Sequence, residues 1–423
     1  MNDAPDQNTD EAVDETPPEA QGSPSPEDEH APRGPDNQHW HNVWRSITTG
    51  NALTAVLSVL LAVIVGSLLI IATDEQVRET LGYIGARPSD FFSAAGEAIS
   101  GAYSALFRGS IYNTRAPDFA TGIRPITETL TFAGPLIAGG LGVAVGFRTG
   151  LFNIGGRGQM LLADAAAGWV ALSVDFPWPL HLALSIAAGL VAGAIWAGIA
   201  GLLKARTGAH EVITTIMLNY VGFYLVFYLL STKGLLQAPG SVNAKSLAMP
   251  ESAIMPTILG DRYNLHLGFV LSLVAVAAVW WLLNRSALGY RFRAVGVNPH
   301  AARTAGISVG RTYVIAMLIA GSLLGLAGTN QVLGTVTAGV SVDLDAGIGF
   351  DAITVALLGR SRPLGVLGAG LLFGAFKAGG FSMQVSEGIS VDLVLVIQSL
   401  IVLFIAAPPL VRAIFRLPAR EAQ

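Results

Sequence analysis

Four polar side chains stand inside otherwise apolar stretches of the sequence, where each needs a hydrogen-bonding partner. They are Asn153, Gln159, Asn219 and Asp351. Each amide has two N–H donors and an acceptor oxygen, and a hydrocarbon surrounding satisfies none of them. Amides and carboxylates of this kind bind hydroxylated solutes, so we expect the four side chains to line one polar path. The alternative is that each amide bonds only to a neighbouring helix.

Four charged residues also fall in apolar stretches: Glu128, Asp164, Asp351 and Lys377. A charge at the centre of a bilayer costs about 2.5–3.5 kcal/mol on insertion scales. Glu128 and Lys377 lie near the predicted outer ends, so their side chains can reach the interface. Asp164 follows Arg157 by seven residues on the same helix face, which predicts an ion pair or a water-filled path beside it.

The sequence lacks the local patterns of common catalytic sites. It contains no GxxxxGK[ST] phosphate loop, no HExxH zinc motif and no GxSxG nucleophile elbow, and it has no cysteine. We therefore predict that the chain is not an enzyme and carries no metal or cofactor of its own. If it moves a solute actively, the energy comes from a partner or from an ion gradient.

The elements that hold these residues are predicted to be transmembrane helices. Of the residues, 52% are hydrophobic and only 13% are charged, which is about half the charged share of soluble domains. The pairs Gly189/Gly193, Gly321/Gly325 and Gly370/Gly374 have the spacing of close helix packing. We expect an all-α polytopic membrane protein with ten segments: Leu53–Ala72, Pro125–Phe147, Gly158–Val174, Leu180–Leu203, Val212–Leu230, Leu267–Leu283, Thr312–Val332, Ile348–Leu358, Leu364–Phe381 and Val391–Ala407.

The distribution of positive charge predicts the orientation. With the N-terminus inside, sixteen Lys and Arg residues fall on the cytoplasmic side and eight outside, as the positive-inside rule expects. Ten segments then place both termini in the cytoplasm. Residues 1–45 are predicted to be a disordered acidic tail, because residues 1–38 hold eleven acidic residues and one Arg. Residues 46–412 form the membrane domain, and residues 413–423 form a short cytoplasmic tail.

Two connections are predicted to contain helices of their own. The outer loop 73–124 includes Asp90–Tyr112, whose apolar residues have helical spacing, so it forms a surface amphipathic helix or a flap. The cytoplasmic loop 284–311 is basic. In it, Asn298 is suited to cap a helix that starts at Pro299, and Gly306 is suited to end it. The predicted helix, Pro299–Ala305, is about two turns long.

This loop contains the sequence RAVGVNPHAARTAGI, which resembles the coupling-helix loop of ABC permeases in the ribose, nucleoside and branched-chain amino acid group. Four further stretches resemble the same family: GLFNIGGRGQMLL, HEVITTIMLNY, GIGFDAITVALLGRSRPLG and VDLVLVIQSLIVLF. The second and the last of these four point to its nucleoside branch. The resemblance covers roughly residues 50 to 415. One position departs from it, since Arg157 stands where relatives commonly carry an acid.

The resemblance implies two pseudo-symmetric permease halves and a set of partners. These are an ABC ATPase that holds ATP and Mg, a second permease that is a paralogue, and an extracellular solute-binding lipoprotein. It places the complex in the bacterial cytoplasmic membrane, where it imports nucleosides by alternating access. The residues expected to couple the chain to the ATPase are Gly296, Asn298, Pro299, Ala301, Ala302, Ala305 and Gly306.

Other solutes and another energy source remain as alternatives. A simple-sugar or branched-chain amino acid importer belongs to the same group of permeases. An ion-driven secondary transporter would be active without an ATPase and would not need the helix Pro299–Ala305.

Overall fold

The computed structural model describes residues 51–416, and every named element within that range is helical. The predicted acidic tail 1–45 lies outside the described residues. The helices in chain order are α2 (Asn51–Thr73), α3 (Glu75–Leu81), α4 (Pro88–Ser110), α5 (Phe119–Gly122), α6 (Arg124–Arg148), α7 (Gly156–Ser173), α8 (Leu180–Thr207), α9 (Glu211–Ser231), the short η1 (Glu251–Ala253), α10 (Leu267–Arg285), α11 (Ala287–Val297), α12 (Pro299–Thr304), α13 (Val309–Asn330), the π-turn η2 (Gln331–Thr335), α14 (Ile348–Leu358), α15 (Pro363–Glu387), α16 (Val391–Ala406) and α17 (Pro408–Ile414).

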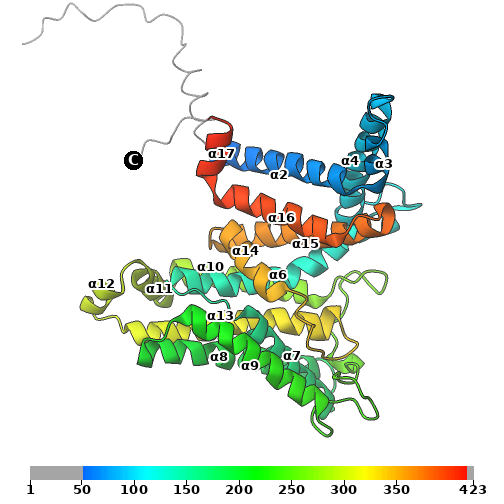
Figure 1. The fold of residues 1–423 in the computed structure, drawn as a ribbon. Helices are drawn as coiled ribbons and strands as arrows, with labels where there is room; N and C mark the ends of the chain where they lie inside the picture. Colours follow the sequence, from blue (N-terminus) through cyan, green and yellow to red (C-terminus); the bar gives the residue numbers. More distant parts are fainter. Residues whose placement is uncertain (1–50, 417–423) are drawn as a thin grey trace, which may run out of the picture. The chain divides into compact units, whose positions relative to one another are not determined.

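Each of the ten predicted segments is a helix, but not all ten have the length and composition of a membrane span. Six helices of the described residues pass that test, or seven when the bent pair α2 and α3 counts as one span. The helix α14 has 11 residues and α16 has 16, both shorter than a bilayer requires. The chain is thus an all-helical, multi-pass membrane protein (Figure 1).

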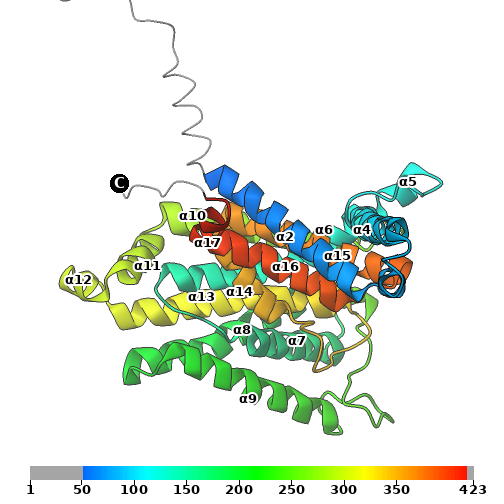
Figure 2. The same ribbon diagram turned by 45° about the horizontal axis from the view of Figure 1, so that its top comes forward.

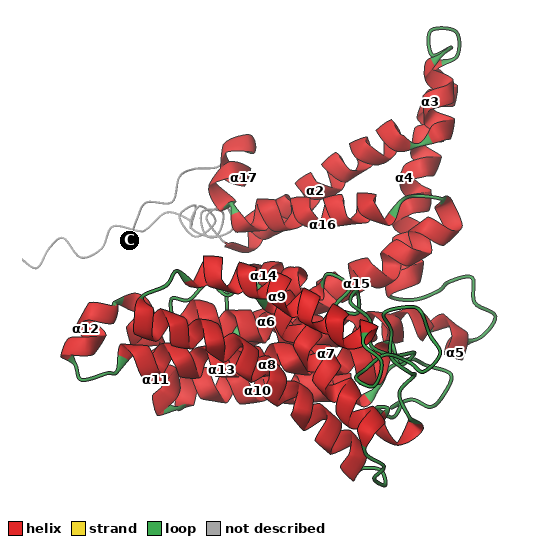
Figure 3. Ribbon diagram, turned by 60° about the horizontal axis from the view of Figure 1, so that its bottom comes forward, coloured by secondary structure: helices red, strands yellow, loops and turns green. Residues whose placement is uncertain are grey.

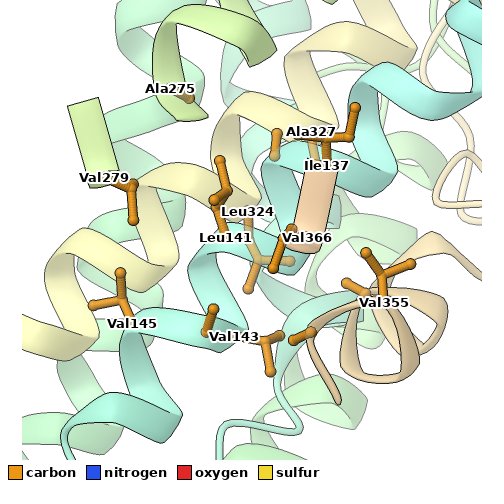
Figure 4. Close-up of a cluster of buried hydrophobic side chains, with 14 of the residues drawn as sticks. Ile137, Leu141, Val143, Val145, Ala275, Val279, Leu324, Ala327, Val355 and Val366 are labelled. Carbon is orange, nitrogen blue, oxygen red and sulfur yellow. The ribbon is translucent and has the colours of Figure 1, made fainter. Parts of the chain in front are cut away.

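The most buried membrane helix is α6. Its apolar window is 83% buried within the protein, compared with 33% for α8 and 22% for α9. Gly, Ala and Val fill its sequence, so neighbouring helices can approach it on all sides. Figure 4 shows the core around it, where Ile137, Leu141 and Val145 of α6 lie among apolar side chains of α10, α13 and the α14–α15 region. By contrast, α9 lies at the edge of the helices in Figures 1 and 2.

The predicted glycine pairs are packing contacts. A Cβ atom on Gly193 of α8 would collide with the carbonyl oxygen of Gly321 on α13, and one on Gly325 would lie 2.6 Å from that of Gly189. On α15, a Cβ on Gly374 would lie 2.5 Å from the carbonyl oxygen of Thr129. These positions have no room for a side chain, so the predicted role of the glycine pairs is confirmed.

Two connections between helices are not helical. After α6 ends, residues 149–155, the first extended segment, carry the chain to the start of α7. After η2, residues 336–347, a turn-rich segment, carry it to the start of α14. In both places, a long helix is followed by a non-helical segment and then by a shorter helix. Such breaks explain why α14 is too short to span: it begins among the other helices rather than at a membrane surface.

The predicted outer helix is present as α4. It packs against α15, since a Cβ on Gly109 would meet Ser382. It also contacts α2, because the Tyr103 hydroxyl donates a 2.9 Å hydrogen bond to the Val63 carbonyl. Phe92 on its other side is 70% exposed. The expected position on the membrane surface stays a prediction.

The loop 284–311 contains the predicted short helix, preceded by α11. Asn298 caps α12, because its side-chain oxygen accepts hydrogen bonds from the backbone N–H groups of His300 and Ala301 at 2.9 and 3.1 Å. Gly306 follows with a φ of +80°, which favours glycine. Figure 3 shows α12 at one end of the helices, with long green connections gathered at the other end.

One residue of the predicted ATPase contact is buried within the chain instead of exposed. Ala302 is 4% exposed and packs in a small apolar cluster with Val295 and Val309. Its neighbour Ala301 is exposed, as is Ala305. The helical turn points Ala302 toward α11 and α13 instead of outward. Gly296 is exposed, but a Cβ on it would collide with the carbonyl oxygen of Arg148, so no side chain fits there.

Candidate functional site

The two short helices α7 and α14 begin against each other. A Cβ atom on Gly156 would lie 2.5 Å from the carbonyl oxygen of Gly349, and a Cβ on Gly349 would meet the backbone nitrogen of Arg157. Only glycine permits this approach of the two backbones. The first turn of any helix leaves N–H groups without intrahelical partners and carries a partial positive charge. The crossing therefore brings two such helix ends together among the membrane helices.

Three of the four predicted path residues form one hydrogen-bonded network beside this crossing. The side-chain amides of Asn153 and Gln159 bond to each other twice, at 3.1 and 2.9 Å. The Asn153 oxygen also accepts from the Gly155 N–H at 2.9 Å. All three amide residues are buried, with exposures of 1% for Asn153 and Gln159 and 7% for Asn219. They stabilise the extended segment instead of projecting into an open cavity.

Asn219 and Thr215 of α9 hold the same segment from the other side. The Asn219 oxygen accepts from the Gly158 N–H of the first turn of α7 at 2.9 Å, and its nitrogen donates to the Ile154 carbonyl at 2.9 Å. The Thr215 hydroxyl accepts from the Ile154 N–H at 3.3 Å. The backbone groups of the extended segment thus find their partners in side chains of α9, as buried polar groups require.

Arg157 lies at the crossing and is neutralised by two acidic residues of the turn-rich segment 336–347. Its guanidinium is 3.3 Å from the Asp345 carboxylate and 3.8 Å from that of Asp343. The guanidinium also lies 5.3 Å from the ring centre of Phe223 on α9, within cation–π range. These contacts explain how a basic residue is accommodated here: the opposite charge comes from the chain's own loop before α14.

Asp351, the fourth predicted path residue, lies apart from the amide network and forms an ion pair. Its carboxylate is 2.9 Å from the Lys377 nitrogen of α15, which also donates to the Ala346 carbonyl at 3.2 Å. Lys377 is only 16% exposed at the side chain. Lys377 thus has a partner within the chain, and the expectation that it reaches the membrane surface stays a prediction. The pair fixes the start of α14 to α15.

Asp164 does not form the predicted ion pair. It is fully buried, and neither carboxyl oxygen has a hydrogen-bond partner among the described residues. A Cβ on Gly328 of α13 would lie 2.9 Å from one of these oxygens, so the side chain is held between α7 and α13. Arg157 turns to the loop instead, because Asp343 and Asp345 offer it two carboxylates.

Part of this charged group is accessible from outside the chain. The Arg157 side chain is 34% exposed, Asp343 is 87% exposed at the side chain, and Phe350 in the first turn of α14 is 50% exposed. Charged side chains rarely face lipid, because a charge in hydrocarbon is costly. Water or another protein chain is therefore the more favourable surrounding for this exposed pair. The sequence did not predict Asp343, Asp345 or Phe223 as parts of the site.

A hollow lies at the C-terminal end of α7, away from the crossing. It has a volume of about 630 Å³ and is lined by residues that include Trp169, Ser173, Lys233, Gln237 and Ser241. Cavities that bind small molecules have volumes of about 300–1,000 Å³. The hollow therefore has the size of a small-molecule site, formed by the end of α7 and the connection after α9.

Comparison with known proteins identifies related chains. A family model described as branched-chain amino acid transport system / permease component matches residues 126–406. The guanosine ABC transporter permease protein of Bacillus subtilis is 37% identical over 318 residues, which are 75% of this chain and 88% of the relative. The nucleoside ABC transporter permease protein of Lactococcus lactis is 37% identical over 289 residues, which are 67% and 79%.

A third relative differs in the solute that its name gives. The glucose ABC transporter permease protein of Haloferax volcanii is 36% identical over 289 residues, which are 66% of this chain and 75% of the relative. No solved structure matches the chain significantly. The matched region includes the first extended segment, the turn-rich segment 336–347, the amide network and α12. The chain therefore belongs to the family of permease components of the branched-chain amino acid transport system type, and it is a transport subunit, not an enzyme.

Proposed function

We propose that this chain is a permease subunit of an ATP-driven importer that carries nucleosides across the bacterial cytoplasmic membrane. The observation that carries the proposal is the 37% identity to a guanosine permease protein over 88% of that relative's length. A second relative named for nucleosides supports the same solute class. The family's description names branched-chain amino acids, but relatives of this chain are named for guanosine and for glucose, so the description does not fix the solute.

The solute path passes the crossing of α7 and α14. The accessible pair Arg157–Asp343 supports this, because a charged face needs an aqueous surrounding or a protein partner. Converging helix starts favour oxygen-rich solute groups, as in other transporters with broken helices. Asn153, Gln159 and Asn219 shape the path wall by fixing the first extended segment. Asp351 does so by anchoring α14 to Lys377.

Energy and delivery come from partner chains. A separate ABC ATPase holds ATP and Mg and docks on α12, whose exposed Ala301 and Ala305 permit close approach. A second permease, a paralogue of this chain, faces the exposed side of the crossing. An extracellular solute-binding lipoprotein delivers solute at the end that carries the 630 Å³ hollow. In this arrangement α12 and both termini are cytoplasmic, ten segments make up the membrane domain, and its two halves are pseudo-symmetric.

A sugar importer is the second candidate. The 36% identity to a glucose permease protein favours it specifically. Every nucleoside carries a pentose, so nucleosides and sugars both present the hydroxyl groups that a polar path would recognise.

One experiment separates these solutes. The complete complex is reconstituted in liposomes, and its ATPase activity is measured with guanosine, adenosine, cytidine, ribose, glucose and leucine in turn. We expect the nucleosides to stimulate hydrolysis at least tenfold more than the other solutes. A complex with an inactive ATPase is the control. Stimulation by glucose or ribose alone would favour the sugar importer, and stimulation by leucine alone would favour the amino acid importer.

A further inference from the structure

The segment that joins α10 to α13 is basic throughout. Residues 285–311 contain five arginines and no acidic residue. Two of these arginines, Arg291 of α11 and Arg311 of α13, line a second hollow, which has a volume of about 590 Å³. Both are exposed, and neither guanidinium forms an ion pair or a side-chain hydrogen bond within residues 51–416. Two like charges therefore share one hollow without a carboxylate to neutralise them.

The helix end that packs beside the hollow supplies no free negative charge. The start of α13 lies against the end of α8, since a Cβ on Gly310 would be 3.4 Å from the Cβ of Ala205. The acidic residue nearby in the sequence is Glu211, and its carboxylate already pairs with Lys204 at 2.6 Å. The other charged residue at this end of α8 is Arg206, which is exposed and basic. The surroundings thus add positive charge to the hollow instead of balancing it.

The rest of the hollow combines apolar side chains with open backbone donors. Leu288, Ile307 and Ile315 line it and are half-buried. The first turn of α13 also faces it through Ser308, whose side chain does not cap the helix. The first N–H groups of a helix have no partner within that helix and attract anions. One wall of the hollow is therefore suited to an anion, and another to a hydrocarbon group.

The neighbouring helices place this hollow at the surface of the membrane. Both α10 and α13 have the length and composition of a membrane span, and the hollow lies where α10 has ended and α13 begins (Figure 1). Trp280 and Trp281 near the end of α10 and Tyr290 of α11 are exposed, and such residues gather where lipid meets water. Ile315 lies about 6 Å further into the span than Arg311. The arginines are thus at the level of lipid headgroups, and the apolar wall extends toward the hydrocarbon.

We propose that this hollow binds an anionic phospholipid, with its phosphate between Arg291 and Arg311 and an acyl chain along Leu288 and Ile315. A guanidinium donates paired hydrogen bonds to phosphate oxygens. Basic pockets between membrane helices are known to hold anionic headgroups. Free phosphate presents the same oxygens but has no group for the apolar wall. A soluble protein partner would have to bring an apolar side chain and a carboxylate together to fill the same hollow.

Native mass spectrometry of the complete transporter tests the proposal. The purified complex is titrated with phosphatidylglycerol and, separately, with phosphatidylcholine of the same acyl chains. We expect phosphatidylglycerol to bind at least tenfold more tightly. Each arginine near an anionic lipid contributes about fivefold, so Arg291→Gln/Arg311→Gln should weaken binding of phosphatidylglycerol about twentyfold and leave that of phosphatidylcholine unchanged.

Two further variants control for charge and for folding. Arg285→Gln removes an exposed arginine of the same segment that does not line the hollow, and it should bind phosphatidylglycerol as the wild type does. Arg291→Lys/Arg311→Lys keeps both charges and should stay within about fivefold of the wild type. Thermal unfolding gives an independent measurement, because added phosphatidylglycerol should stabilise the wild type and Arg285→Gln more than Arg291→Gln/Arg311→Gln.

Three results would overturn the proposal. Equal binding of the two lipids would show an ordinary contact with bulk lipid. Displacement of phosphatidylglycerol by millimolar inorganic phosphate would show a site for free anions. Loss of the ATPase subunit from Arg291→Gln/Arg311→Gln, with unchanged binding of phosphatidylglycerol, would assign the two arginines to the contact between the subunits. None of these outcomes depends on which solute the transporter carries.

Discussion

Arg157 shows how a single charged side chain is accommodated among membrane helices. It stands in the first turn of α7, where the helix end is already partially positive, so it needs more compensation than an arginine elsewhere. Asp345 at 3.3 Å, Asp343 at 3.8 Å and the ring of Phe223 supply it. Asp345 is 3% exposed, which makes it the partner that depends most on the arginine. The pair should therefore be a strong determinant of stability.

A double-mutant cycle tests this dependence. We expect Arg157→Met to lower the free energy of unfolding by about 3 kcal/mol, because it leaves the buried Asp345 carboxylate without a cation. Asp345→Leu should have a similar effect, because it leaves the Arg157 guanidinium without its nearest carboxylate. The double variant should lose clearly less free energy of unfolding than the sum of the losses in the two single variants. Thermal unfolding of the purified chain in detergent measures all four proteins, and additive losses would contradict the pairing.

Asp164 presents the opposite case, a buried carboxyl with no hydrogen-bond partner among residues 51–416. Asp164→Asn keeps the shape of the side chain and removes the possibility of a buried charge. We expect this variant to unfold at the same temperature as the wild type or at a higher one, with a change in free energy of about 1 kcal/mol or less. Asp164→Leu gives a control of similar volume without polar atoms. A marked destabilisation in Asp164→Asn alone would indicate that the carboxylate has a role that the amide cannot fill.

At the scale of elements, the short helix α12 has two distinct faces. Ala302 packs inward with Val295 and Val309, whereas Ala301 is exposed. Adjacent alanines of one helix thus lie in different surroundings. This gives a matched pair of substitutions for the proposed ATPase contact.

The same change at these two positions should have different consequences. Ala301→Glu places a carboxylate in the proposed contact, where an unpaired charge costs about 2–5 kcal/mol. We expect normal expression and thermal stability but loss of transport and of solute-stimulated ATP hydrolysis. Ala302→Glu buries the carboxylate in the chain's own apolar cluster, so it should lower thermal stability itself. Full transport by Ala301→Glu would argue against α12 as the coupling element.

At the scale of the whole molecule, the topology can be tested with introduced cysteines, against the clean background of a chain that has none. With α12 in the cytoplasm, Lys245→Cys should react with a membrane-impermeant thiol reagent in intact cells. Arg303→Cys should react only after the cells are opened. The unmodified chain is the control. Labelling of Arg303→Cys in intact cells would reverse the proposed orientation.

Much of the helical framework could be predicted from the sequence because apolar runs and capping residues act locally. The apolar segments, the cap at Asn298 and the glycine pairs all have local causes. The amides Asn153, Gln159 and Asn219 bond within the chain, which was the stated alternative to a shared solute path, and their place on such a path stays a prediction. The pairs Arg157–Asp345 and Asp351–Lys377 could not be predicted, because each joins residues distant in the sequence. The inward turn of Ala302 likewise depends on tertiary packing.

The crossing of α7 and α14 has a consequence for the synthesis of the protein. The start of α7 leaves the ribosome long before Asp345 and Gly349 do, so during that interval Arg157 lacks the carboxylates that later neutralise it. Releasing a helix into lipid is costly while the charge at its end is not neutralised. We therefore expect α7 to stay beside the insertion machinery until α14 is made. Chains truncated before residue 336 should remain cross-linked to that machinery at α7, while the full chain should not.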